Sequence, residues 1–188
     1  MLAGGASSRM GADKALLVAD GQPLLVRAVR LVERACGSAT VVGPVERYGG
    51  RGWEVVPDLR AGCGPLAGIE TALSLGRADW NLVVAVDMPA LEADMLVRLV
   101  EHAAGSRADY VLAVGEGGLP EPLCAVYHLR CLETVRLALD AGVRKVTQAF
   151  VGLQVAHFQI DNQDSVANVN TPEEWSAWRQ QGDCGRRG

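Results

Sequence analysis

The sequence predicts a single α/β domain, in which helices cover an open and mainly parallel sheet. Of its 188 residues, 49% are apolar and 21% are charged, as in a soluble globular protein. Helical and strand-like periodicities alternate along the chain, which is typical of right-handed strand–helix–strand crossovers. Because only 5% of the residues are aromatic, the core must be built from Val, Leu and Ala.

The first half of the chain is predicted to contain two helices and two strands. Residues 23–36 place apolar side chains on one helical face and arginines on the other. Short apolar runs that end at proline-containing turns predict strands over 39–42 and 53–56. Helical spacing returns over 66–75 and ends at Gly76.

The second half continues the alternation. Residues 81–86 form an unbroken apolar run after Asn81, as expected of a strand that is buried on both faces. A last helix is predicted to begin at Thr171, which offers an N-cap hydroxyl before Pro172 and Glu174. The other predicted elements are helices over 91–104 and 129–141 and strands over 110–114, 123–127 and 154–160.

One domain over residues 1–181 is expected, followed by a flexible tail over 182–188. A parallel strand needs about 4–6 residues, yet only Met1 and Leu2 precede Ala3 and the first glycines. We therefore expect the first strand to be truncated and the native protein to begin several residues upstream.

Charge and composition exclude several classes of protein. A net charge of −4 and a pI near 5.4 give no general attraction to nucleic acid or to an anionic membrane. The apolar run at 82–86 is too short to span a bilayer, and no secretory leader is visible. The cysteines are odd in number and form no CxxC pair, which argues against a disulfide framework or a zinc site and favours the cytoplasm.

A glycine-rich loop over 3–14 follows the first strand. Small residues let the backbone approach a ligand closely, and successive N–H groups can point at phosphate oxygens. Arg9 and Lys14 add two full positive charges to this loop. The loop matches neither GxxxxGK[ST] nor GxGxxG, so a plain surface turn with two solvated cations is the alternative interpretation.

Polar side chains follow several of the predicted strands. Asp87 ends the most apolar strand, where a carboxylate can bind a hard cation, and Asp58 follows the strand at 53–56. Asn168 and Asn170 flank Val169, so alternation places both side chains on the same side of an extended segment. Asp87 and Asp58 have an alternative interpretation as turn or helix-capping residues, and the two asparagines as polar residues that lead into a helix.

Five segments occur in an order that resembles a known family. They read LAGGASSRMGADKALL over 2–17, PDLRAGCGPLAGI over 57–69, VVAVDMP over 83–89, PEPLCAVY over 120–127 and NVNTPEE over 168–174. Together they resemble the molybdenum cofactor guanylyltransferases, which are MobA-like nucleotidyltransferases. The resemblance covers nearly the whole chain and implies a three-layer α/β/α, Rossmann-like fold with a mainly parallel sheet.

The resemblance also implies roles for individual residues. Lys14 would hold the phosphates of the nucleotide, and Asp58 would lie beside the nucleotide. Asp87 would bind Mg²⁺, with Asn170 as a second metal ligand, and Arg9, Lys14 and Asp87 would form the catalytic group. Backbone contacts to the nucleotide would come from the residues at the first turn, Leu2, Ala3 and Gly4.

One position departs from the family pattern. Close relatives have an asparagine after the second strand, where this chain has Gly43, so a side-chain contact to the nucleotide is expected to be lost. Candidates for binding the pterin are the 115–123 loop and the region of Lys145, on their position alone.

The activity that the resemblance implies is Mg²⁺-dependent transfer of GMP from GTP to molybdopterin, with release of pyrophosphate. A cytidylyltransferase acting on molybdopterin, a small transferase acting on a sugar or alcohol phosphate and a non-catalytic nucleotide-binding protein are the alternatives. A carboxylate or backbone carbonyls in the first loops would suit the N1–H and N2–H₂ donors of guanine. Expected partners are GTP, molybdopterin and, transiently, proteins that deliver molybdopterin or mature molybdoenzymes, with no nucleic acid and no membrane.

Overall fold

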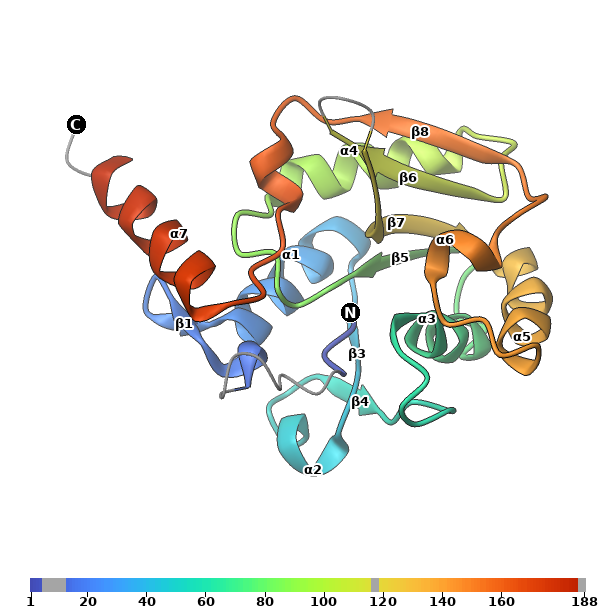
Figure 1. The fold of residues 1–188 in the computed structure, drawn as a ribbon, viewed down its shortest axis with the longest axis horizontal. Coiled ribbons are helices and arrows are strands. Elements are labelled where there is room, and N and C mark those ends of the chain that lie inside the picture. Colours follow the sequence, from blue (N-terminus) through green and yellow to red (C-terminus); the bar gives the residue numbers. More distant parts are fainter. Residues whose placement is uncertain (5–12, 116–118, 186–188) are drawn as a thin grey trace.

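The computed structural model describes residues 1–4, 13–115 and 119–185, with side chains described up to residue 180. Its centre is a mixed sheet flanked by helices (Figure 1). The order across the sheet is β4–β3, the N-terminal segment, and then β5–β7–β6–β8. The strands are β3 (Thr40–Val42), β4 (Glu54–Val56), β5 (Trp80–Val84), β6 (Tyr110–Val114), β7 (Pro120–His128) and β8 (Val155–Gln159).

The N-terminal segment joins the two parts of this sheet. Leu2 forms parallel bridges to Val42 on one side and to Ala85 on the other. The Leu2 N–H donates to Val84 O at 2.8 Å, and the Ala3 N–H donates to Val42 O at 2.9 Å. The first turn of the chain therefore leaves the middle of the sheet, between β3 and β5.

Strand β7 runs antiparallel to both of its neighbours, β5 and β6. The other pairings, β3 with β4 and β6 with β8, are parallel, as are the bridges of Leu2. A hairpin explains the exception, because the few residues between β6 and β7 cannot make the crossover that a parallel pair requires. The prediction of an α/β domain with a mainly parallel sheet is confirmed, with one reversed strand.

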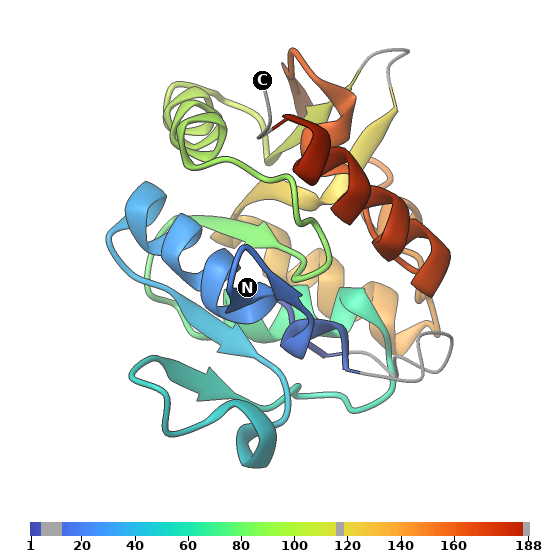
Figure 2. The same cartoon turned by 90° about the vertical axis from the view of Figure 1, so that its left-hand side faces the viewer.

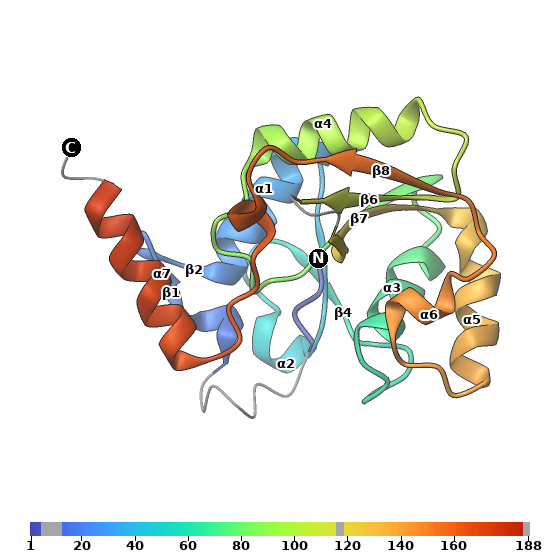
Figure 3. The ribbon, with the colours of Figure 1, turned by 45° about the horizontal axis from the view of Figure 1, so that its top comes forward.

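Helices cover both faces of the sheet, which gives the three layers that were expected (Figure 3). Neighbouring strand residues alternate between two apolar cores, since Val84 and Val126 belong to one and Val83 and Ala125 to the other. Helices α1 (Leu24–Cys36) and α4 (Ala93–Ala104) pack on the first core, and α3 (Pro65–Ser74), α5 (Leu132–Asp140) and α6 (Val146–Ala149) on the second.

The last helix, α7 (Pro172–Gly185), lies outside these layers, beside a small hairpin of β1 (Val18–Ala19) and β2 (Gln22–Pro23) (Figure 2). Trp175 packs with Val169, Leu24 and Ala19 in a separate apolar cluster. The predicted capping box is present, because the Glu174 N–H donates to Thr171 Oγ1 at 3.2 Å and the Thr171 N–H donates to Glu174 Oε2 at 3.1 Å. Helix α7 continues past residue 181, so residues 182–185 of the expected tail are helical.

Short helical segments complete the fold, and most of them were not predicted from the sequence. Besides the short α6, they are α2 (Val45–Tyr48) and the 3₁₀ turns Lys14–Leu16, Leu129–Cys131 and Gln163–Val166. Among the described residues, no helix combines the length and the apolar composition that a membrane span requires.

Candidate functional site

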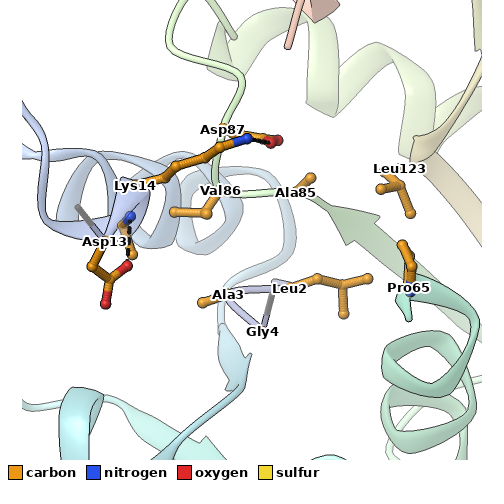
Figure 4. A pocket seen from close by; sticks show the side chains of 11 residues that line it. Leu2, Ala3, Gly4, Asp13, Lys14, Pro65, Ala85, Val86, Asp87 and Leu123 are labelled. Atoms are coloured by element: carbon orange, nitrogen blue, oxygen red, sulfur yellow. Dashed lines mark hydrogen bonds and ion pairs between the residues drawn. The ribbon is translucent and has the colours of Figure 1, made fainter. Parts of the chain in front are cut away.

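A cavity of about 170 Å³ opens where the N-terminal segment and β5 end at the same edge of the sheet (Figure 4). Ligands of open α/β sheets bind at this edge, outside the carboxyl ends of the strands. Four of the predicted site residues line the cavity together with Lys14, so segments that are distant in sequence meet here. The lining residues are Leu2, Ala3, Gly4, Asp13, Lys14, Ala15, Pro65, Ala85, Val86, Asp87 and Leu123.

The ammonium group of Lys14 joins two residues from distant parts of the chain. Its Nζ donates to Asp87 Oδ2 at 3.0 Å and to Asn170 Oδ1 at 2.7 Å. The Lys14 side chain reaches across the cavity toward Asp87 (Figure 4). The side chains of Lys14 and Asp87 are only 16% and 19% exposed, so solvent screens their ion pair less than it would at the open surface.

Asp87 and Asn170, the two acceptors of Lys14, are each held in place by a hydrogen bond of their own backbone. Asp87 follows β5, and its carbonyl oxygen accepts from the Val169 N–H at 2.9 Å. The Asn170 N–H donates to Glu174 Oε2 at 2.6 Å, which attaches Asn170 to the N-terminus of α7. Two oxygen ligands therefore converge on the position that the Lys14 ammonium takes, and such a pair also suits a hard divalent cation.

Asp13 holds the turn that carries Lys14. Its carboxylate accepts from the Ala15 N–H at 3.1 Å and caps the turn Lys14–Leu16. The hydroxyl of Tyr48 in α2 donates to the same carboxylate at 2.8 Å, and Arg47 pairs with it at 3.1 Å. Burial, followed by the hydrogen bond to Asp13, raises the pKa of Tyr48 to about 12, so the hydroxyl remains a donor.

A second cavity of about 290 Å³ adjoins the first and shares Leu2, Gly4 and Pro65 with it. A Cβ at Gly4 would lie 2.8 Å from Asp58 Oδ2, and one at Gly68 would lie 2.9 Å from the side chain of Leu2. A larger residue at either position would therefore have to displace the side chain of Asp58 or of Leu2. Its remaining lining residues are Val42, Asp58, Arg60, Gly62, Gly64 and Gly68.

Asp58 lies in the wall of this second cavity and is half-buried. Its carboxylate accepts no hydrogen bond from another described residue. Burial raises its pKa above the usual range. An acceptor that is partly desolvated and has no partner within the described chain is available to a ligand with N–H donors.

The two asparagines that were predicted to lie on the same side of an extended segment contact different groups. Asn170 binds Lys14, whereas Asn168 Nδ2 donates to Glu121 Oε2 at 3.1 Å. Glu121 also accepts from the Leu123 N–H at 2.9 Å, and burial raises the pKa of its carboxyl group. Glu121 was not among the predicted site residues, although its place in the PEPLCAVY segment over 120–127 could have indicated it.

Several other predicted residues either lie outside the described residues or line neither cavity. Arg9 lies in residues 5–12, and part of the 115–123 loop lies in residues 116–118, both outside the described residues. Lys145 lines neither of the two cavities. A Cβ at Gly43 would lie 3.2 Å from the Tyr48 ring, so the ring takes the space beside this departure from the family pattern.

Comparison with known proteins identifies the family of this chain. Residues 1–157 match the model of the MobA-like NTP transferase domain. The chain belongs to this family. A probable molybdenum cofactor guanylyltransferase of Deinococcus radiodurans is 37% identical over 180 residues, which cover 92% of this chain and 88% of the relative. Another from Pelotomaculum thermopropionicum is 34% identical and covers 100% of this chain and 94% of the relative.

The fold of this MobA-like transferase is also found in solved structures. Molybdopterin-guanine dinucleotide biosynthesis protein A from Archaeoglobus fulgidus superposes with a TM-score of 0.81 at 24% identity, over 97% of this chain and 96% of that one. At this identity the likeness concerns the fold alone. The three-layer α/β fold expected from the resemblance is therefore confirmed.

The raised pKa of Asp58 predicts a cost in stability at neutral pH. A carboxyl group whose pKa is raised in the folded state stabilises the fold while protonated, and this contribution is lost as the pH rises through the folded pKa. Asp58→Asn should therefore raise the melting temperature at pH 7, by less than about 3 °C because the group is only half-buried. The difference from wild type should disappear below the ordinary pKa of Asp.

Glu54 is the matched control for this prediction. Hydrogen bonds from Arg77 and then Thr40 lower the pKa of Glu54, so its contribution is present above the ordinary pKa and is lost as the pH falls. Glu54→Gln should change the melting temperature at pH 7 in the opposite direction. Thermal unfolding of both variants between pH 3 and 8 gives the comparison, and a destabilised Asp58→Asn at pH 7 would contradict it.

Proposed function

We propose that this protein transfers GMP from GTP to a phosphate oxygen of molybdopterin, forming molybdopterin guanine dinucleotide and pyrophosphate. The observation that carries the proposal is the junction of Lys14, Asp87 and Asn170 beside a second cavity lined by Asp58. The relatives named molybdenum cofactor guanylyltransferase support the choice of substrates. One cavity would then bind phosphates and the other the base.

The reaction requires no side-chain nucleophile. The phosphate oxygen of molybdopterin attacks the α-phosphorus of GTP, a new P–O bond forms, and the bond from this phosphorus to the leaving pyrophosphate breaks. Both reactants are anions, so positioning and charge neutralisation are the main catalytic contributions. Lys14 supplies the positive charge within the described cavity, and Arg9 is proposed to add a second.

The residues present fit a magnesium ion. Among the described residues, no three His, Cys, Asp or Glu side chains gather around one point. Mg²⁺ is usually bound through one or two protein oxygens together with substrate phosphates, so a pair of ligands suffices. Asp87 and Asn170 would hold the ion, which when bound neutralises charge on the phosphates. Their oxygens already converge on Lys14 Nζ at 3.0 and 2.7 Å.

Lys14 has to exchange partners when a nucleotide binds. Its ammonium is compensated by Asp87 in the structure described here. A triphosphate would draw the ammonium toward its own oxygens and leave Asp87 and Asn170 available to the cation. Leu2, Ala3 and Gly4 line the same cavity, and we propose that their backbone contacts the nucleotide there.

Purified protein with Mg²⁺, molybdopterin and GTP should release pyrophosphate and form the dinucleotide, and should do so much less with CTP, ATP or UTP. The reason is that the phosphate groups are common to all four, so the base cavity must discriminate among them. A preference for CTP would identify a cytidylyltransferase instead. Turnover only with a sugar or alcohol phosphate would overturn the proposed acceptor.

Lys14→Met should lower kcat/KM by roughly 10²–10³, because a charge aimed at the phosphates is lost. The fold should persist, since Lys14 belongs to none of the apolar clusters. Steady-state kinetics with GTP, checked by the far-UV spectrum, measures both effects. Arg98→Met, which removes an exposed cation paired with Asp161, is the control, and equal activity of the two variants would refute the role of Lys14.

Asp87→Asn should reduce activity to a very low level that hardly responds to added Mg²⁺, because the charged ligand is lost. Asn170→Ala removes only a neutral ligand, so we expect activity to remain with a half-saturating Mg²⁺ concentration raised on the order of 10-fold. Magnesium titrations of turnover distinguish the two variants. A normal titration in Asp87→Asn would exclude Asp87 from the metal site.

A further inference from the structure

Helix α3 carries two buried polar side chains behind the wall of the second cavity, the one proposed to bind the base. Glu70 and Thr71 are each 3% exposed, and they are the charged or polar side chains most deeply buried within the described residues. Thr71 Oγ1 accepts from the Leu59 N–H at 3.0 Å. Glu70 accepts from Arg60 Nε at 2.9 and 3.2 Å. Both buried groups therefore hold the segment 58–60, which lines the second cavity.

The pairing of Glu70 fixes the guanidinium of Arg60. A buried carboxylate is costly unless a charged donor satisfies it, and Arg60 is the nearest cation to Glu70, at 2.9 Å. A second carboxylate, that of Asp140 in α5, accepts from Arg60 Nη1. Arg60 is thus held between two helices, with its plane constrained by two acids.

One end of this guanidinium is left for a ligand. Arg60 Nη2 donates no hydrogen bond to any other described residue, and Arg60 lines the cavity together with Asp58. Because Glu70 and Asp140 already balance the charge of Arg60, this place is a poor site for an additional phosphate. It suits neutral hydrogen-bond acceptors arranged in a plane.

We propose that Arg60 is the residue that selects guanine, by donating to the O6 and N7 acceptors of the base. Arginine is the residue that most often contacts these two atoms of guanine, and here the two N–H groups of Nη2 would donate to them because Nε and Nη1 are already bonded to Glu70 and Asp140. Asp58, in the same cavity, would accept from N1–H and N2–H₂. This inference rests on the proposed function, because it assigns the base that the second cavity takes.

The pair of residues would reject the other bases for a physical reason. Adenine has an amino donor where guanine has O6, and it has no N1–H, so Arg60 and Asp58 would each face a group of their own kind. Cytosine turns the N3 acceptor toward a carboxylate and is too small to reach both residues. When a bound base covers polar groups and leaves them unpaired in this way, the loss can discriminate strongly between substrates.

The competing interpretation is that Arg60 only links α3 to α5. Equilibrium binding of nucleotides to the whole protein distinguishes the two, because 7-deaza-GTP lacks the N7 acceptor and ITP lacks the N2 amino group. Titration calorimetry with Mg²⁺ should find wild type binding GTP on the order of 10-fold more tightly than 7-deaza-GTP. This comparison needs no variant and no molybdopterin.

Two variants test Arg60 itself. Arg60→Lys retains a cation for Glu70 but loses the planar donors. The double variant Arg60→Met with Glu70→Gln removes both charges of the pair, so no unpaired carboxylate stays buried in case the single change unfolds the protein. In both, GTP should bind about 10- to 100-fold more weakly and no better than 7-deaza-GTP. ITP should bind more weakly than GTP to the wild type, because it lacks the N2 amino donor that we assign to Asp58. This difference between ITP and GTP should remain in both Arg60 variants. Arg34→Lys, at an exposed pair with Asp94, is the matched control. It should leave the relative affinities for GTP, 7-deaza-GTP and ITP unchanged.

The outcomes separate this inference from the proposed function. If GTP binds and is transferred to molybdopterin but 7-deaza-GTP binds equally well to wild type, only the role of Arg60 is overturned. The role of Arg60 is likewise overturned if Arg60→Lys keeps the wild-type ratio of GTP affinity to 7-deaza-GTP affinity. If no nucleoside triphosphate binds in the presence of Mg²⁺, both the inference and the proposed function fail.

Discussion

The contact of the Lys14 ammonium with Asp87 and Asn170 is the interaction on which the rest of the site depends. It brings together the turn after the first loop, the end of the central strand β5 and the segment before α7, across 156 positions of sequence. Each arm of the junction has its own support, from the Asp13 cap, from the sheet and from the capping box of α7. This junction also gives a role to α7, which lies outside the three layers, because Glu174 at its N-terminus holds Asn170 beside Lys14.

The two cavities differ in charge, and this difference fits the proposal that the first binds phosphates and the second binds the base. The first contains a lysine whose charge is compensated by Asp87 and whose ammonium group also donates to Asn170, so an anion and a cation can enter together without leaving either charge unpaired. The second contains an aspartate without a described partner and an arginine that is already neutralised by Glu70 and Asp140. This arrangement suits the hydrogen-bonding edge of a neutral base better than a charged group. In our proposal, the shared residues Leu2, Gly4 and Pro65 lie where the nucleoside passes from one cavity to the other.

Local patterns predicted most of the fold, because apolar runs and caps located the strands and the start of α7. The expectation that ligands bind at the carboxyl ends of the strands led to the edge of the sheet where Lys14 and Asp87 meet, but the sequence did not predict that the ammonium of Lys14 bonds to both Asp87 and Asn170. The reversed direction of β7 was missed, because pairing direction depends on a loop and not on periodicity. The bonds of Tyr48 to Asp13 and of Arg60 to Asp140 were also missed. They join residues 35 and 80 positions apart, and a single sequence carries no sign of such pairings.

The central claim is that Lys14 takes the place between Asp87 and Asn170 that a cation takes when the nucleotide binds. A crystal structure with Mg²⁺ and a GTP analogue that cannot be cleaved at the α-phosphorus tests it most directly. We expect Lys14 Nζ to have moved to phosphate oxygens, with the metal ion about 2.1 Å from oxygens of Asp87 and Asn170. A structure in which Lys14 keeps both of these contacts, while the nucleotide is bound and the metal ion lies elsewhere, would contradict the account.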